Sequence, residues 1–336
     1  MMIHIVNHVP RVRHARAWVR GMSVALALSL AALPAAAQAG ASTGEHTAVI
    51  NGARLWYRVA GSGSVPVVFV PGGPGRNSYD FAAVQGPRLE RRLKMVYFDP
   101  RGTGRSERPA SGDYAIATMV EDIEGLRREL GAPRIALIGH SFGALMALEY
   151  AAKYPQRVSR IVYADGLWDT RLQCRARRDR LIASFPALRE RILSDTLDEQ
   201  GKRRSDCELE FRVLNGKDRE AFNDAGVFRD SVSKARLEGL DRASALSNTG
   251  EMSRALFRAG LLEYRFTRLD RLTMPVQVIV GRYDAVGGME PQRILARRLP
   301  NARFVEFPES GHFTYLDEPD RFAHEVTNFL TGTRRP

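Results

Sequence analysis

Short runs of apolar, β-branched and aromatic residues recur along the chain and alternate with segments of helical spacing. Continuous runs of this kind are typical of strands that are buried on both faces of a parallel sheet. They predict strands at residues 65–70, 95–98, 135–138, 161–164, 276–280 and 303–307. Helical spacing predicts helices at residues 118–130, 142–154, 289–299 and 317–330. The alternation predicts an α/β fold, with a mostly parallel central sheet and helices on both faces.

Two departures from this alternation define the organisation of the chain. Residues 48–50 and 55–59 alternate around Asn51-Gly52, which predicts a hairpin ahead of the parallel strands. Between about residue 167 and residue 272 the helical spacing continues without a clear strand. We therefore expect a helical cap at 168–272, inserted between the core segments 40–167 and 273–336. Open α/β sheets bind ligands at the C-terminal edge of the strands, and we expect the cap to cover that edge.

The first 39 residues have the three-part layout of a secretory signal peptide. Four arginines between positions 11 and 20 precede an apolar run at 22–33, and Ala37 and Ala39 form an A-x-A cleavage site. The apolar run is shorter than the roughly 20 residues that a membrane-spanning helix needs, so we expect cleavage rather than a membrane anchor. The sequence thus predicts export to a periplasm or the medium, with no stable membrane insertion after cleavage.

Net charge changes this picture little. The formal charge is +12 at pH 7, and the four arginines of the leader account for part of it, which leaves +8 for the rest of the chain. The basic residues are spread out, and no basic recognition helix or patch with interleaved aromatics stands out, so the sequence does not predict nucleic-acid binding. The cap itself holds 18 acidic and 22 basic residues.

The chain has two cysteines, Cys174 and Cys207. In an exported protein such a pair can form a disulfide, although two free thiols remain the alternative. No other cysteine or histidine cluster has the spacing of metal ligands, so the sequence predicts no metal site.

Ser141 is the candidate nucleophile. It is the centre of the G-x-S-x-G sequence Gly139-His140-Ser141-Phe142-Gly143, which follows one predicted strand and opens a predicted helix. A sharp strand–turn–helix connection is the setting that a nucleophile elbow requires, and the glycines permit its close approaches. A serine hydroxyl needs a base to take its proton, so the hypothesis requires a histidine elsewhere.

His312 and Asp284 are the candidate base and acid. His312 lies in the loop after the strand at 303–307, while the other histidines of the mature chain precede the sheet or lie inside the elbow or the last helix. Asp284 follows the strand at 276–280, and Asp165, after the strand at 161–164, is its rival. Both aspartates satisfy the order serine, acid, histidine, but the separation of Asp284 from His312 by one helix and one strand favours Asp284. Asp165 could otherwise line the pocket or cap the first cap helix.

Acyl transfer also requires donors for an oxyanion. The backbone N–H of Phe142, directly after the nucleophile, is one candidate. Gly72 or Gly73, in the glycine-rich loop after the strand at 65–70, is the other. No metal or organic cofactor is implied by these residues.

These segments together resemble the α/β-hydrolase superfamily and, within it, the proline iminopeptidases. The resemblance covers residues 55–330 apart from the cap. It is carried by P-G-G-P-G at 71–75, D-P-R-G-T-G-R-S at 99–106, G-R-Y-D at 281–284 and S-G-H at 310–312. It implies the α/β-hydrolase fold, Ser-His-Asp chemistry, and a small molecule or short peptide as substrate.

Departures from the iminopeptidase pattern keep two substrate classes open. Pro71 and Pro100 stand where that family has histidine and glutamine, and its elbow more usually reads G-G-S-W-G. Iminopeptidases bind a free amine with cap carboxylates, and Glu263 is the candidate here. The alternatives are therefore an aminopeptidase that releases N-terminal proline, a carboxylesterase or lactonase with the same triad, and, less favoured, a non-catalytic binding protein on this fold.

Overall fold

A computed structural model describes residues 41–332 except 196, 202–203 and 247–249. The predicted signal peptide at 1–39 lies outside the described residues. Within the described part of the chain, no helix is both long enough and apolar enough to cross a membrane.

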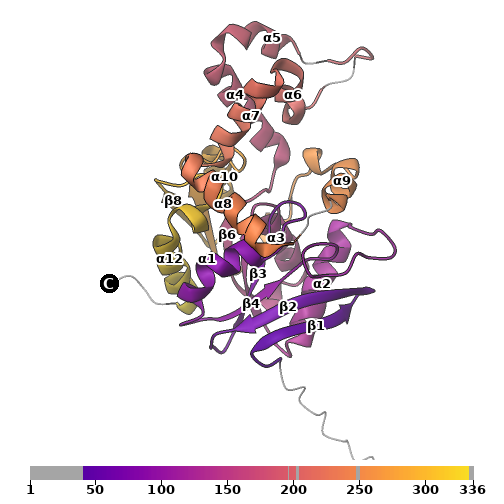
Figure 1. Cartoon of the computed structure of the whole chain (residues 1–336), viewed down its shortest axis with the longest axis vertical. Coiled ribbons are helices and arrows are strands. Elements are labelled where there is room, and N and C mark those ends of the chain that lie inside the picture. The colour runs from indigo at the N-terminus through magenta and orange to yellow at the C-terminus, as the bar shows by residue number, and fades with distance from the viewer. Residues whose placement is uncertain (1–40, 196, 202–203, 247–249, 333–336) are drawn as a thin grey trace, which may run out of the picture. The chain divides into compact units, whose positions relative to one another are not determined.

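One sheet organises the described chain (Figure 1). The strands are β1 Gly44–Ile50, β2 Ala53–Ala60, β3 Pro66–Val70, β4 Lys94–Phe98, β5 Ile135–His140, β6 Val158–Ala164, β7 Val276–Gly281 and β8 Ala302–Phe307. Their order in the sheet is β1-β2-β4-β3-β5-β6-β7-β8, and neighbours from β4 onward are parallel, while β2 pairs antiparallel with both β1 and β4. The predicted α/β class, mostly parallel sheet and N-terminal hairpin are confirmed.

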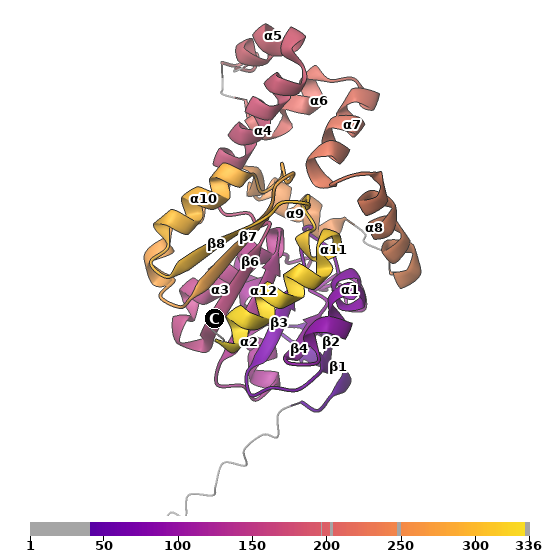
Figure 2. The same ribbon diagram turned by 90° about the vertical axis from the view of Figure 1, so that its left-hand side faces the viewer.

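Helices cover both faces of the sheet (Figure 2). Their bounds are α1 Tyr79–Leu89, α2 Ile116–Glu129, α3 Phe142–Lys153, α10 Met289–Arg298, α11 Thr314–Asp317 and α12 Pro319–Thr331. One apolar core packs α2, α3 and α10 against the sheet, and a second core packs α1, α11 and α12 against the other face. Helix α1 was not predicted, because its last turn contains Gly86 and Pro87, two residues that weaken a helical pattern.

The segment between β6 and β7 is helical. Its helices are α4 Thr170–Ser184, α5 Arg189–Ser194, α6 Leu209–Val213, α7 Gly216–Val227, α8 Ser231–Ser244 and α9 Glu251–Arg258. Short 3-10 turns lie in the same segment at Pro186–Leu188, Asp206–Glu208, Leu261–Glu263 and Leu269–Arg271, and another, Pro155–Arg157, lies between α3 and β6. Leu181, Ile192, Leu209 and Phe222 belong to a separate small core within the cap. The cap is thus partly stabilised by its own contacts.

A disulfide joins Cys174 in α4 to Cys207, and their Cα atoms lie 4.7 Å apart. It connects the first cap helix to the turn that precedes α6, across a sequence separation of 33 residues. The disulfide therefore closes the loop from Cys174 to Cys207, which contains α5.

Candidate active site

Ser141 lies at the sharp turn between β5 and α3. Its φ of 53° and ψ of −121° fall where non-glycine residues are rare, so the turn is strained. The neighbouring glycines make the turn possible. A Cβ on Gly139 would lie 2.6 Å from the Cα of Ala144, and one on Gly143 would lie 2.0 Å from the carbonyl oxygen of Val70. Any larger residue at these positions would collide with backbone, which explains the G-x-S-x-G spacing.

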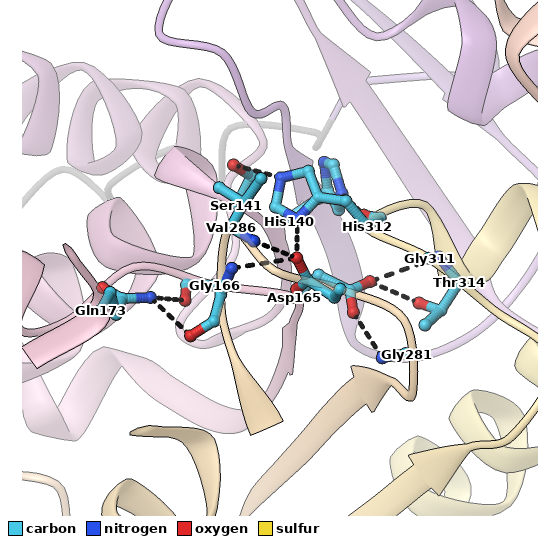
Figure 3. Close-up of polar contacts among 12 residues, drawn as sticks. His140, Ser141, Asp165, Gly166, Gln173, Gly281, Val286, Gly311, His312 and Thr314 are labelled. Carbon is cyan, nitrogen blue, oxygen red and sulfur yellow. Dashed lines mark hydrogen bonds and ion pairs between the residues drawn. The ribbon is translucent and has the colours of Figure 1, made fainter. Parts of the chain in front are cut away.

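The structure brings Ser141, His312 and Asp284 together in one hydrogen-bonded line. His312 Nε2 lies 2.9 Å from Ser141 Oγ, and His312 Nδ1 lies 3.0 Å from Asp284 Oδ1. Figure 3 shows the hydroxyl of Ser141 facing the imidazole of His312. All three residues are at most 6% exposed, so their mutual interactions are little screened by water.

The acid loop after β7 fixes the Asp284 carboxylate. Its Oδ1 accepts hydrogen bonds from the backbone N–H groups of Val286 at 2.8 Å and Gly287 at 3.0 Å. The same oxygen faces the imidazole of His312. The orientation of the acid toward His312 therefore depends on the path of the loop at 284–287.

Asp165, the rival acid, occupies a different place. It is fully buried at the end of β6, with a φ of 50°. Its carboxylate accepts hydrogen bonds from the Gly281 N–H at 2.9 Å and from the hydroxyl of Thr314 at 2.7 Å (Figure 3). Burial, followed by the charge of Asp284, raises the pKa of Asp165 well above its ordinary value. Asp165 thus connects the starts of the acid loop and of the helix that follows His312.

The pKa of His312 is set by opposing effects. Burial lowers it, but the charge and hydrogen bond of Asp284, together with the charge of Asp165, raise it more, so the net pKa lies above 6.5. The raised pKa means that the site stabilises the protonated form of His312, which is the form a general base adopts once it has taken a proton.

His140, inside the elbow, positions the histidine loop. Its Nε2 donates to the carbonyl oxygen of His312 at 2.7 Å, and the two ring centroids lie 5.0 Å apart. Burial and the nearby charge of His312 lower the pKa of His140 well below 6.5, so this ring is neutral. A neutral ring that donates from Nε2 holds the backbone of the candidate base without competing for its proton.

The candidate oxyanion donors lie beside the nucleophile. Phe142 begins α3, where backbone N–H groups lack acceptors within the helix. Gly72 lies so close that a Cβ there would be 2.9 Å from Ser141 Cβ and from His140 Nδ1. Gly73 has a φ of 112°, which favours glycine. The loop after β3 therefore approaches Ser141 as closely as its glycines allow.

Two glutamines clamp the loops that flank this site. Gln173 Nε2, from the cap helix α4, donates to the carbonyl oxygens of Gly166 at 2.9 Å and Gly287 at 3.0 Å. Gln292 Nε2, from the core helix α10, donates to the same two oxygens at 2.8 and 2.9 Å. Figure 3 shows the contact between Gln173 and Gly166. The first cap helix thus reaches the loop that carries Asp284.

The cap also contacts the loop after β3. Arg76 Nη2 forms ion pairs with Asp80 of α1 at 2.9 Å and with Asp241 of α8 at 2.7 Å. Ser253 of α9 donates to the carbonyl oxygen of Pro74 at 2.5 Å. Two cap helices therefore help to fix the loop that contains Gly72 and Gly73.

Glu263 lies in another environment. Its carboxylate is 2.5 Å from Arg171 Nε and about half exposed. It lines a cavity of about 830 Å³ beside the disulfide, and Ser141, Asp284 and His312 are not among the described residues that line this cavity. The structure therefore does not bring Glu263 together with the three candidate catalytic residues. In the described part of the chain, no group of three or more histidine, cysteine or acidic residues could hold a metal ion.

Three residues that organise this site, His140, Gln173 and Gln292, were not predicted from the sequence. His140 was visible inside the elbow motif, but its contact with His312 depends on a loop 172 residues away. Gln173 and Gln292 carry no sequence signal, because a glutamine in a helix is ordinarily a solvated residue. Their role follows only from the tertiary positions of Gly166 and Gly287.

The α/β-hydrolases are the class of proteins in which a serine lies at a strained strand–helix turn and faces a histidine and an acid from loops after later strands. Ser141, His312 and Asp284 have this arrangement. A family model described as the alpha/beta hydrolase fold matches residues 65–319, so the chain belongs to this family. The enzyme is a hydrolase that resembles proline iminopeptidases.

Individual relatives have several activities. The chain is 25% identical over 288 residues to a proline iminopeptidase of Saccharolobus solfataricus, covering 82% of this chain and 87% of the relative. It is 27% identical over 264 residues to a 2-hydroxymuconate semialdehyde hydrolase of Pseudomonas putida, covering 77% of this chain and 82% of the relative. Among solved structures, a proline iminopeptidase-related protein of Thermus thermophilus has a TM-score of 0.69, 22% identity and coverage of 87% and 98%. An esterase of Exiguobacterium antarcticum has a TM-score of 0.61, 22% identity and coverage of 86% and 100%.

Proposed function

We propose that this hydrolase cleaves carboxylic esters or amides by two-step acyl transfer, with Ser141 as nucleophile, His312 as general base and Asp284 as the acid. The observation that carries the proposal is the continuous hydrogen-bonded line from Asp284 through His312 to Ser141, at 3.0 and 2.9 Å. A buried serine within reach of a histidine that is itself oriented by a carboxylate is the arrangement that activates a hydroxyl.

The mechanism uses protein groups and water alone. Ser141 Oγ attacks the substrate carbonyl carbon while His312 Nε2 takes the hydroxyl proton, and Asp284 stabilises the imidazolium. The oxyanion accepts hydrogen bonds from the Phe142 N–H and from the N–H of Gly72 or Gly73. His312 then protonates the departing alcohol or amine. Water that gives its proton to His312 attacks the acyl-enzyme, releases the acid and restores Ser141.

A fluorophosphonate probe tests the nucleophile directly. We expect the probe to label the protein at Ser141, as located by mass spectrometry of the modified peptide. Ser141→Ala should lose labelling and turnover while keeping the far-UV circular dichroism of the parent. Ser231→Ala, at an exposed position that starts α8, is the matched control and should label normally. Full turnover by a folded Ser141→Ala variant would refute the assignment.

The substrate can be an ester or a peptide with N-terminal proline. The resemblance to proline iminopeptidases supports the second class, and the esterase among the structural neighbours supports the first. An amine-binding role for Glu263 receives no support from its ion pair with Arg171. Hydrolysis of proline anilide and of a short acyl ester, each beside Ser141→Ala, separates the two classes.

We also propose that residues 1–39 direct export and are then removed. The support is the sequence of this segment, with its arginines, its apolar run and the small residues at 37 and 39. N-terminal sequencing of protein recovered from the periplasm or medium should begin at Gly40. Full-length chain that accumulates in the cytosol would contradict this proposal.

A further inference from the structure

A small apolar cavity adjoins the candidate oxyanion donors. It has a volume of about 20 Å³, and its lining includes Gly72 and Phe142. The apolar side chains that face it include Phe98, Met119, Ile123, Met146 and Met252, all of which are buried. Met252 comes from the cap helix α9, whereas the others belong to the core. The cavity thus lies between the core and the cap.

The position of this cavity indicates which half of a substrate it receives. In acyl transfer the carbonyl oxygen lies on the oxyanion donors, and the leaving group lies beside the histidine that protonates it. Gly72 and Phe142 are among the described residues that line the cavity, whereas Ser141 and His312 are not. A group in this cavity therefore lies past the oxyanion donors and away from the histidine, which corresponds to the acyl side of the scissile bond.

The charge of the cavity wall indicates what kind of acyl group fits. Asp122 is the one charged side chain among its described lining residues. That carboxylate is committed to Arg101, whose Nε and Nη2 each lie 2.6 Å from it, and to Asn51 Nδ2 at 3.0 Å. Removing a partner from a buried ion pair leaves an uncompensated charge, so Asp122 is not available for a substrate amine.

The size of the cavity sets the length of the acyl group. A volume of about 20 Å³ accepts a group near the size of one water or one methyl. A pyrrolidine ring with a cationic nitrogen needs more space and an unpaired carboxylate. Methionine side chains are flexible and can adapt, so a slightly longer chain is accommodated when they move.

On the basis of the proposed acyl-transfer function, we propose that this cavity is the acyl pocket and that it takes a short, uncharged aliphatic acyl group. Acetyl and propionyl esters are the expected substrates, and Met252 limits the length of the chain. The pocket selects the ester class over N-terminal proline because it offers neither room nor a free anion for the cationic ring.

The test is an acyl-length series of p-nitrophenyl esters with two, four, six and eight carbons. We expect kcat/KM of the parent to be highest for the shortest chains. Met252→Ala should move the optimum to longer chains, with a gain of about fourfold for each methylene that becomes buried. Met252→Phe should retain the acetyl ester and lose the longer ones. Phe257→Ala is the control, because Phe257 lies on the same helix but is 47% exposed.

The outcomes separate this proposal from the function on which it rests. If no ester or amide is cleaved in a Ser141-dependent manner, the acyl-transfer function itself fails. Ser141-dependent turnover with an acyl profile that neither Met252 variant changes overturns the pocket assignment alone. A second series, of acetate esters with larger alcohols, would show a Met252 effect if the cavity held the leaving group. Efficient cleavage of proline anilide would likewise overturn the proposal.

Discussion

Removing the glutamine clamp is the perturbation that most directly tests how the cap supports the site. Gln173 and Gln292 donate to the same buried carbonyl oxygens, those of Gly166 and Gly287. Either glutamine alone leaves both oxygens with a partner. Losing both leaves two buried acceptors without a donor. The two substitutions should therefore be strongly coupled, although the residues come from different parts of the chain.

The magnitude follows from the number of hydrogen bonds. Gln292→Ala removes two hydrogen bonds, and Gln173→Ala removes three, because Gln173 Oε1 also accepts from the Trp168 N–H at 3.3 Å. At a net contribution of about 0.5–1.5 kcal/mol for each hydrogen bond, we expect losses in the free energy of unfolding of about 1–3 kcal/mol for Gln292→Ala and about 1.5–4.5 kcal/mol for Gln173→Ala. Each unsatisfied buried acceptor costs a further 1–3 kcal/mol or so, and this cost appears only in the double variant, where both carbonyl oxygens are left without a donor. The double variant should therefore exceed the sum of the singles by about 2–6 kcal/mol.

Urea unfolding followed by far-UV circular dichroism measures the four free energies of the cycle. Gln156→Ala is the control, because Gln156 is exposed, and it should change the free energy of unfolding by less than about 0.5 kcal/mol. Kinetic measurements should accompany the cycle. Gln173 holds the carbonyl of Gly287, and the N–H of Gly287 donates to Asp284, so losing Gln173 should disturb the orientation of the acid. Gln173→Ala should therefore lower kcat more than it raises KM.

An additive cycle would refute this reasoning. If the loss of the double variant equals the sum of the single losses within about 0.3–0.5 kcal/mol, the two glutamines act independently and the carbonyls find other donors. An unchanged kcat in a folded Gln173→Ala variant would show that the acid loop keeps its path without the cap helix.

Further predictions concern the acid, the base and the disulfide. Asp284→Asn should lower kcat by on the order of 10⁴-fold, because the imidazole loses its orienting carboxylate. Activity should rise with pH through the raised pKa of His312, since the base must be neutral, and Asp284→Asn should move this limb of the kcat/KM profile to lower pH. Asp165→Asn should instead lower the free energy of unfolding by about 1–3 kcal/mol in denaturant titrations, with a smaller loss of kcat. Replacing Cys174 and Cys207 by alanine should cost about 3–4 kcal/mol in the same titrations, a value that follows from the length of the closed loop. A cost below about 1 kcal/mol would argue against the bridge as a stabilising link.

The core of the fold could be predicted because its strands are buried on both faces. The sequences of such strands are continuous apolar runs. The run at 276–280 predicted a strand, and β7 spans Val276–Gly281. The boundaries were less accurate where polar residues occupy a strand. β6 begins at Val158 rather than at 161, since Val158 still pairs with Ile135 of β5, although Ser159 and Arg160 interrupt both the apolar run and the regular register. Hydrogen bonding, not apolarity, decides such ends.

The proximity of the three candidate catalytic residues could be predicted because each lies in the connection that follows a strand. Short loops after parallel strands all lie at the C-terminal edge of the sheet. The positions of Ser141, Asp284 and His312 after three such strands therefore predict that they share this edge. Sequence order could not separate Asp284 from Asp165, since both follow strands. The structure distinguishes them by partners, because the imidazole meets Asp284 while Asp165 accepts from Gly281 and Thr314.

The arrangement of the cap could not be read from the sequence, and the contacts of α4 show why this matters for function. The apolar pattern of the cap is diffuse because its small core draws residues from several short helices. Yet Gln173 lies one residue before the disulfide and reaches the acid loop, so the first turns of α4 belong functionally to the site. The outer helices α5 and α6 pack mainly on the core within the cap. Changes of substrate specificity can therefore arise in α9, which contributes Met252 to the proposed acyl pocket, whereas replacing α4 would disturb the Asp284 loop.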